Sequence, residues 1–388
     1  FVDHELGTIQ LFSNNNIDIA LGSVLYESSR TPLFYILNKY IPFNDNAEKL
    51  RLFWFFFSIS IPFFLFKSLQ IIFDEKLDKF YIFLFATIIL LSPYFRTNAF
   101  WPSSENLQIF FVVLSTYFYL SIINKNFLQK KKLYIYAILS IFFGYCAFYT
   151  DQKAFFLVVI IYLDLVRKND FSFFLIFSLV NLIFFFPTIY LYIVWGGLVP
   201  VESQFRVSKY LFGTNIFISS VGIYFLIPFL TNFKNIDFSK ELKGGNFDIF
   251  CMLIFLVYLI FTLPVEPITF GSGIVSKLFG VVTSKLNLNW NLIKYFYFFI
   301  NLIFIFIIYF LINKTLKNLI IFLSFILVYN LTPITYQSYV DPIFYIIVFT
   351  LIDFKKNILV FNKINAYLFL LFYASMLVGS IIFRNYLI

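Results

Sequence analysis

Long apolar runs, with most charged residues confined to the short stretches between them, constrain this chain more than any other feature. Crossing about 30 Å of hydrocarbon takes around 20 helical residues at 1.5 Å each. A segment that crosses lipid must satisfy all its backbone hydrogen bonds within the protein, so it is a helix or part of a closed barrel. The runs lack the alternation of apolar and polar residues that barrel strands show. We therefore expect an all-α, polytopic transmembrane helical bundle of about twelve spans. The apolar runs lie near residues 52–73, 80–95, 107–123, 133–150, 151–166, 171–195, 214–232, 248–266, 292–313, 318–335, 336–353 and 365–384.

The composition supports a membrane protein and excludes several other classes. Hydrophobic residues make up 61% of the 388 residues and charged residues 13%, against roughly 25% charged in soluble chains. The net charge of +9 is scattered among short loops, which argues against nucleic acid as a partner. Cys146 and Cys251 both lie in apolar runs, and His4 is the one histidine. A disulfide framework and a cysteine or histidine metal cluster are therefore not expected.

Loop charges predict the orientation in the membrane. If residues 1–51 lie outside, every inner loop is short and basic, with Lys130, Lys131 and Lys132 the clearest anchor. This divides the chain into a first extracytoplasmic segment, 1–51, and a transmembrane domain, 52–388. Because residue 1 is Phe and no initiator Met precedes it, we expect the sequence to begin inside a longer protein, just after a lost first helix.

Polar residues collect on the predicted outer side. The runs at 151–166 and 336–353 are too short to cross the membrane unless the polar residues at one end of each helix lie at the membrane boundary. Burying a carboxylate there costs free energy unless it is paired or has a function. A helix-end ion pair or an interfacial anchor remains an alternative at each position. Residues 3 and 5 of a helix point about 200° apart, so at most one of these two acids faces a given substrate atom. The candidate site residues among the outer acids and amides are Asp3, Glu5, Glu105, Asp151, Gln152, Gln337 and Asp341, and those among the outer cations are Arg96, Lys153, Arg206 and Lys209.

Several motifs together resemble the GT-C superfamily of membrane glycosyltransferases, which use polyprenyl-phosphate sugars, in particular the protein-mannosyltransferase and aminoarabinose-transferase types. Asp3-His4-Glu5 is similar to the acidic motif of that family's first outer loop. Thr31-Pro32-Leu33-Phe34-Tyr35 and Leu50-Arg51 are similar to its downstream pattern of Pro, apolar and Tyr residues before an Arg that opens the next helix. Leu91-Ser92-Pro93-Tyr94 through Glu105 is similar to its second outer loop.

Three other segments resemble the branch of dolichol-linked alpha-1,2-glucosyltransferases more weakly. They are Phe148-Tyr149-Thr150-Asp151-Gln152, Trp195-Gly196-Gly197 and Tyr336-Gln337-Ser338-Tyr339-Val340-Asp341-Pro342. The last motif of that branch carries Glu-Pro-Arg, whereas this chain has Asp341-Pro342-Ile343 without the Arg.

The resemblance implies roles for the outer residues. Asp3 would be the base of an inverting transfer, and Glu5 or Glu105 would orient the acceptor or hold a metal. Arg96, Lys153, Arg206 or Lys209 would neutralise the donor phosphate, and Asp151, Gln152, Gln337 and Asp341 would line the substrate pocket. Whether a divalent cation takes part stays open. The implied partners are a polyprenyl-phosphate sugar, a lipid, glycan or protein acceptor, and membrane lipids.

Two other functions remain open at this point. The first is a transporter or flippase of a lipid-linked or small substrate, although the centres of the predicted spans are almost empty of charge, Lys67 excepted, and the midplane charges of ion-coupled transporters are missing. The second is a non-catalytic membrane scaffold. The bias toward residues with AT-rich codons and the short loops favour a bacterial inner membrane, with the active site facing outward.

Overall fold

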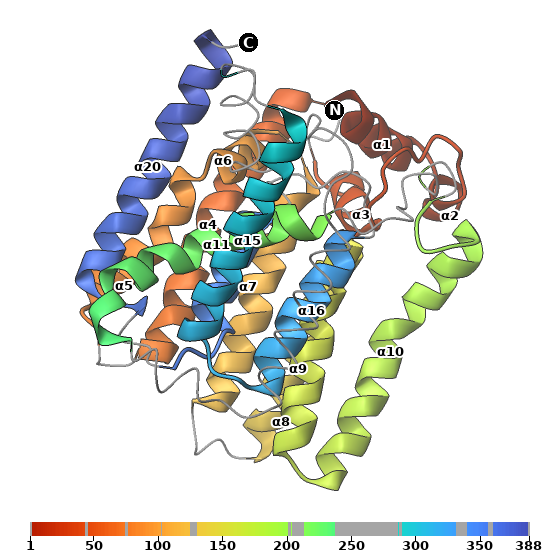
Figure 1. Cartoon of the computed structure of the whole chain (residues 1–388). Helices are drawn as coiled ribbons and strands as arrows, with labels where there is room; N and C mark the ends of the chain where they lie inside the picture. Colours follow the sequence, from red (N-terminus) through yellow and green to blue (C-terminus); the bar gives the residue numbers. More distant parts are fainter. Residues whose placement is uncertain are drawn as a thin grey trace. The chain divides into compact units, whose positions relative to one another are not determined.

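The computed structural model describes residues 2–42, 46–73, 77–101, 103–124, 130–200, 203, 213–236, 286, 289–330, 340–355 and 360–386. Within these ranges the chain is all-helical, as expected, apart from one isolated bridge between Ile312 and Phe354. It forms two compact units (Figure 1). Unit 1 comprises residues 1–207 and 373–388, and unit 2 comprises residues 208–372. The predicted boundary at residue 51 stays a prediction.

Unit 1 contains α1 to α10 with two short 3-10 turns, unit 2 contains α11 to α18, and α20 runs from unit 2 into the residues grouped with unit 1. The bounds are α1 Val2–Asn14, α2 Ile17–Leu21, α3 Leu33–Lys39, α4 Ala47–Phe73, α5 Lys79–Thr87, η1 Ile88–Leu91, α6 Pro93–Phe100, α7 Ser104–Ile123, α8 Lys130–Thr150, η2 Gln152–Ala154, α9 Phe155–Lys168, α10 Phe171–Trp195, α11 Gly213–Thr231, η4 Phe233–Asn235, α15 Trp290–Leu311, α16 Leu316–Asn330, α18 Ile343–Thr350 and α20 Lys363–Tyr386.

Five helices in the described part of the chain are long and apolar enough to cross a membrane: α4, α7, α8, α10 and α20. The pair formed by α5 with η1 and α6 passes the same test, but is bent by 64° at Ser92. The expected total of about twelve spans is therefore not confirmed. The predicted run 151–166 becomes η2 and the 14-residue α9, and the run 336–353 contains the 8-residue α18. The run 248–266 lies outside the described residues.

Local sequence signals explain where several helices begin and end. Asp170 caps α10 by accepting a hydrogen bond of 2.8 Å from Phe173 N, and Ser92 caps α6 with Pro93 in its first position. At the other end of α10, Gly196 takes the left-handed conformation at φ 62°, which favours glycine. Helix α10 thus ends at Trp195, where the predicted run 171–195 ends.

The pairing of α7 with α8 forms the centre of unit 1. Ser115 Oγ donates to Ser140 O at 2.7 Å, and Ser140 Oγ donates to Ser115 O at 2.9 Å. Small residues let helix backbones approach closely in membranes, and hydroxyls can bond across the interface. A Cβ on Gly144 would lie 3.1 Å from Val158 Cγ2, so this glycine also brings α9 close to α8.

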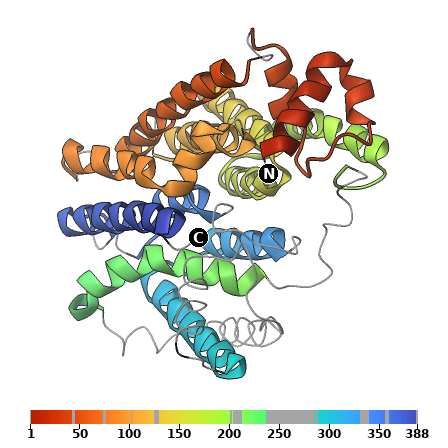
Figure 2. The ribbon, with the colours of Figure 1, turned by 90° about the horizontal axis from the view of Figure 1, so that it is seen from above.

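The first 42 residues form three short helices packed against one end of the unit 1 helices. Phe12, Tyr26, Phe34 and Tyr35 are buried in one apolar cluster with Trp54, Leu107 and Trp195 of the longer helices. Trp195 Nε1 donates to Leu21 O at 3.1 Å, which attaches α2 to the end of α10. Figure 2 shows α1 to α3 beside α8 and α10 at this end. The first segment is therefore a folded cap.

Helix α10 has the surface of a lipid-facing helix. Only 11% of an 18-residue apolar stretch of α10 is buried within the protein. The exposed side chains of the helix include Leu179, Leu182 and Phe186. Apolar exposure on this scale is typical of a surface that contacts lipid rather than water. Together with the other four candidate spans, it identifies the chain as a membrane protein.

Unit 2 depends on a close approach of two helices. A Cβ built on Gly222 of α11 would lie 2.2 Å from Cγ of Phe304 in α15, a side chain that is itself 7% exposed. The contact includes Phe304 Cβ at 2.6 Å, which a turn of the ring does not relieve, so α11 and α15 pack at this distance because residue 222 has no side chain. Thr231 Oγ1, near the end of α11, donates to Asn365 Oδ1 at 2.7 Å.

We predict that Gly222→Ala destabilises the protein by roughly 1–3 kcal/mol, the usual cost of an extra methyl group in a packed core. Gly379→Ala is the matched control, because nothing lies within 4 Å of its Cβ position in α20. Denaturant unfolding of both variants in one detergent measures the difference. Equal stability of the two variants would contradict the close approach.

Candidate functional site

Charged side chains from four distant segments meet in unit 1 where the cap of α1 to α3 covers the long helices. Glu5 comes from α1, Arg30 from the loop before α3, Glu105 from the first turn of α7, and Asp151 with Lys153 from the junction of α8 and α9. All five side chains are at most 19% exposed. We call these five residues the ion cluster.

Arg30 is the central member of the ion cluster. Its guanidinium makes a two-pronged ion pair with Glu105: Nη1 donates to Oε2 at 2.7 Å, and Nη2 donates to Oε1. Nη1 also donates to Ser104 Oγ at 2.5 Å and lies 3.6 Å from Glu5 Oε1. This fork geometry fits arginine and not lysine. Arg30 therefore joins α1 to the start of α7.

Tyr35 fixes the position of Glu5. Its hydroxyl donates to Glu5 Oε2, and the hydroxyls of Tyr35 and Ser28 lie 2.6 Å apart. The Tyr35 ring is fully buried between Phe12 and Tyr26, whose ring centroids lie 5.7 and 5.6 Å away. Aromatic packing thus holds the phenol that orients the Glu5 carboxyl group.

The junction between α8 and α9 supplies the rest of the site. Asp151 Oδ1 accepts from Lys153 N at 3.0 Å, and Asp151 Oδ2 lies 3.7 Å from Lys153 Nζ. Gln152 Nε2 donates to Ser29 O at 2.5 Å, which fixes the orientation of the amide. Gln152 Oε1 is then buried without a hydrogen-bond partner. A buried acceptor in this state costs free energy until a donor reaches it.

The electrostatic surroundings change the protonation of Glu5. Burial raises the pKa of Glu5 above 4.5, while Arg30 and the Tyr35 hydroxyl oppose part of that shift and the charges of Glu105 and Asp151 add to it. A buried carboxyl group with a raised pKa among charges of both signs is a candidate proton-transfer group. Burial and the charge of Glu5 raise the pKa of Tyr35 well above 10.0, so its phenol stays protonated.

Carboxylates gather at this site, but a cation of the protein already lies between them. The guanidinium of Arg30 contacts both Glu5 and Glu105. Among the residues that the structure describes, no group of three or more His, Cys, Asp or Glu side chains is placed to hold a metal ion. The question of a divalent cation, open from the sequence, stays open.

The structure brings five of the sequence-predicted site residues together: Glu5, Glu105, Asp151, Gln152 and Lys153. Arg96 is exposed on α6. Asp341 belongs to unit 2, where it is buried and accepts a hydrogen bond from Tyr224. Asp3 lies in α1, but its side chain is outside the described part, as are residues Arg206, Lys209 and Gln337. Their predicted roles stay predictions.

Sequence reasoning did not select Arg30, which pairs with both glutamates. The signal was present: a single arginine stands between Ser29 and Thr31-Pro32, in a segment otherwise rich in acids. Its partner Glu105 is 75 residues away. Only the fold shows that the two meet.

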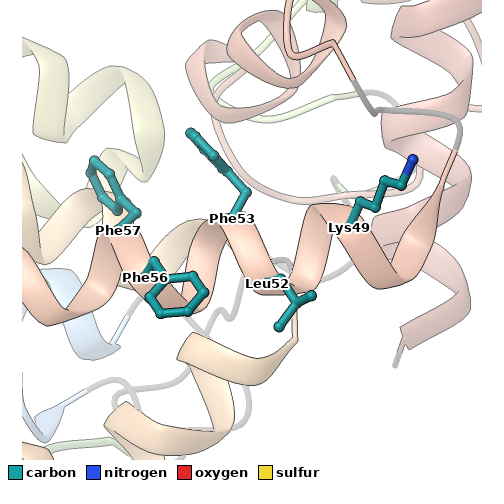
Figure 3. Close-up of a pocket in the computed structure, with 5 residues that line it drawn as sticks. All are labelled: Lys49, Leu52, Phe53, Phe56 and Phe57. Atoms are coloured by element: carbon teal, nitrogen blue, oxygen red, sulfur yellow. The ribbon is translucent and has the colours of Figure 1, made fainter.

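A groove of about 420 Å³ lies elsewhere on unit 1, along α4, and is lined by Lys49, Leu52, Phe53, Phe56 and Phe57 (Figure 3). Its lining is apolar except for Lys49. None of the ion cluster residues lines this groove, so it is a separate feature of the surface.

Comparison with family models, curated proteins and solved structures found no match to this chain. The function must therefore be argued from the ion cluster itself.

We predict that Arg30→Gln destabilises the protein by roughly 3–5 kcal/mol, because it leaves buried carboxylates without their counter-charge. Lys168→Gln is the control, since Lys168 pairs with Asp164 at 2.7 Å but is 48% exposed, and such surface pairs contribute below about 1 kcal/mol. Denaturant unfolding in detergent compares the two. The central role of Arg30 is wrong if both variants are equally stable.

Proposed function

We propose that this protein is an integral-membrane glycosyltransferase, which moves a sugar from a polyprenyl-phosphate donor to an acceptor hydroxyl group. The observation that carries the proposal is the meeting of Glu5, Arg30, Glu105, Asp151 and Lys153 at one end of an apolar helical unit. An amphiphilic donor keeps its phosphate at the membrane surface and its tail in lipid. A charged site at the end of lipid-facing helices fits such a molecule.

The reaction needs a base near the acceptor. The acceptor oxygen bonds to the anomeric carbon while its proton passes to the base, and the bond from that carbon to the phosphate oxygen breaks with its electron pair leaving on the phosphate. We assign the base to Glu5, whose carboxyl group is positioned by Tyr35 and has a raised pKa. Asp3 remains the alternative base that the family resemblance implies.

Other residues of the site suit the remaining tasks. Arg30 is a positioning residue, because both carboxylates that it contacts depend on it for their geometry. Lys153 forms the longer ion pair, 3.7 Å to Asp151, and we assign it to the leaving phosphate. The buried Oε1 of Gln152 lacks a donor, and a substrate hydroxyl group would supply one.

Charge sidedness supports an outward-facing site in a bacterial inner membrane. The ion cluster lies at the end of unit 1 where α8 finishes, whereas Lys130, Lys131 and Lys132 lie where α8 begins. Lys and Arg are enriched in cytoplasmic loops. We therefore propose that these lysines face the cytoplasm and that the ion cluster faces outward.

We predict that Glu5→Gln lowers sugar transfer by roughly 10²–10⁴-fold, the usual contribution of a positioned base. Activity is measured as sugar transferred from a polyprenyl-phosphate donor to an acceptor by purified protein in vesicles. Tyr40→Phe, a change at an exposed tyrosine of the same cap, is the control and should keep full activity.

Asp3→Asn, tested in parallel, separates the two candidate bases. A loss in Asp3→Asn with full activity in Glu5→Gln would move the base to Asp3 and overturn the assignment here. Gradient-dependent uptake of substrate without any glycosyl product would instead support the transporter alternative.

The pH dependence gives an independent test of Glu5. As a base, Glu5 must be ionised, so activity should fall as the pH drops through its raised pKa. Tyr35→Phe removes a hydrogen bond that lowers this pKa and should move the acidic limb of the kcat/KM profile to higher pH. A limb that stays in place, or moves to lower pH, would exclude Glu5 as the titrating group.

A further inference from the structure

A second cation in unit 1 lacks the partners that Arg30 has. The guanidinium of Arg51, on α4, lies over the ring of Trp101 with 4.3 Å between Cζ and the ring centroid. Its Nε is buried and has no hydrogen-bond partner. No ion pair to Arg51 is found among the described residues. The arginine is thus positioned but not neutralised.

The stacking on Trp101 does not use the hydrogen-bond donors of Arg51. A cation–π contact uses the face of the guanidinium, whereas its five N–H donors lie in the plane of the group. A tetrahedral oxyanion can therefore accept from Nε and a neighbouring Nη while the stack stays in place. Phosphate suits this fork particularly well.

A second buried donor lies on the neighbouring helix. Asn98 Nδ2 is buried without a hydrogen-bond partner, and Asn98 stands one helical turn before Trp101. Helix α6, which carries Asn98, packs against α4. Each buried donor without an acceptor costs free energy, and an oxyanion bound between these neighbouring helices would supply acceptors for both.

The position of Arg51 along α4 would place it at the level of the phospholipid head groups. Helix α4 has 27 residues and is about 40 Å long, longer than the roughly 30 Å hydrocarbon layer. Arg51 is the fifth residue of α4, which places it near the boundary of that layer. The phosphates of membrane lipids lie at the same level.

We propose that Arg51, Asn98 and Trp101 form a binding site for the phosphate of an anionic ligand, with the guanidinium and the amide donating to its oxygens. The site does not depend on the proposed transferase activity. A lipid head group and a free phosphate or pyrophosphate offer the same oxyanion, and the experiment distinguishes them.

Lys49 provides a matched control. It lies two residues before Arg51 on the same helix, and positions two apart on a helix point about 200° away from each other. Lys49 is exposed at the apolar groove of α4 (Figure 3). Replacing it removes one positive charge at nearly the same depth but on another face.

The test measures lipid retention by native mass spectrometry of the purified full chain. Phosphatidic acid, phosphatidylglycerol and phosphatidylcholine are added separately, and inorganic pyrophosphate is added as a competitor. We expect the wild-type protein and Lys49→Gln to retain the two anionic lipids over phosphatidylcholine, and Arg51→Gln to bind them at least about tenfold more weakly. Arg51→Lys, which keeps the charge but loses the fork, should also bind more weakly.

Each outcome decides between explanations. Competition by pyrophosphate, lost in Arg51→Gln, identifies a free anion as the ligand, and its failure to compete identifies the head group. Equal lipid binding by the wild-type protein and Arg51→Lys overturns the proposal, as does a loss in Lys49→Gln as large as that in Arg51→Gln. If Arg51→Gln does not fold, the comparison with Arg51→Lys decides alone.

Discussion

The contact of one guanidinium with two carboxyl groups organises the described end of unit 1. Arg30 binds Glu105 through both Nη atoms and lies 3.6 Å from Glu5. Each of these charged side chains is at most 19% exposed, and burying any one of them without a counter-charge would cost several kcal/mol. Because Glu5, Arg30 and Glu105 belong to α1, the following loop and α7, their pairing requires the cap to sit on the long helices in one way. The apolar cluster around Tyr26 and Tyr35 reinforces that placement.

The same arrangement separates polar chemistry from lipid. Side chains of α10 face outward along most of its length, while charge is concentrated where the cap covers the helix ends. A site of this kind can hold an amphiphilic substrate without admitting charge to the hydrocarbon layer. Helix α4 carries two cations near its start: Arg51 stacks on Trp101, and Lys49 lies at an apolar groove. The ion cluster and the Arg51 site are two distinct sets of polar contacts.

The sequence predicted the helical class and the residue types at the site better than their partners. Apolar runs predicted the five candidate spans, and the run 171–195 has the same bounds as α10. The run 151–166 predicts one span. In the structure Asp151 caps the 3-10 turn η2, and α9 after it is only 14 residues long. Helix geometry predicts that only one of positions 3 and 5 faces a given atom; Glu5 lies 3.6 Å from Arg30, and because the side chain of Asp3 is outside the described part, the expectation stays a prediction. That pairing spans distant segments, so no local pattern could reveal it.

The most direct measurement of the central claim is donor consumption by the purified wild-type protein. The protein in vesicles is incubated with a panel of polyprenyl-phosphate sugars and candidate acceptors, and both free polyprenyl phosphate and glycosylated product are quantified. We expect at least one donor to yield free polyprenyl phosphate and glycosylated product in equal amounts. Intact donors across the whole panel, with the protein folded and its ion cluster unaltered, would contradict a transferase.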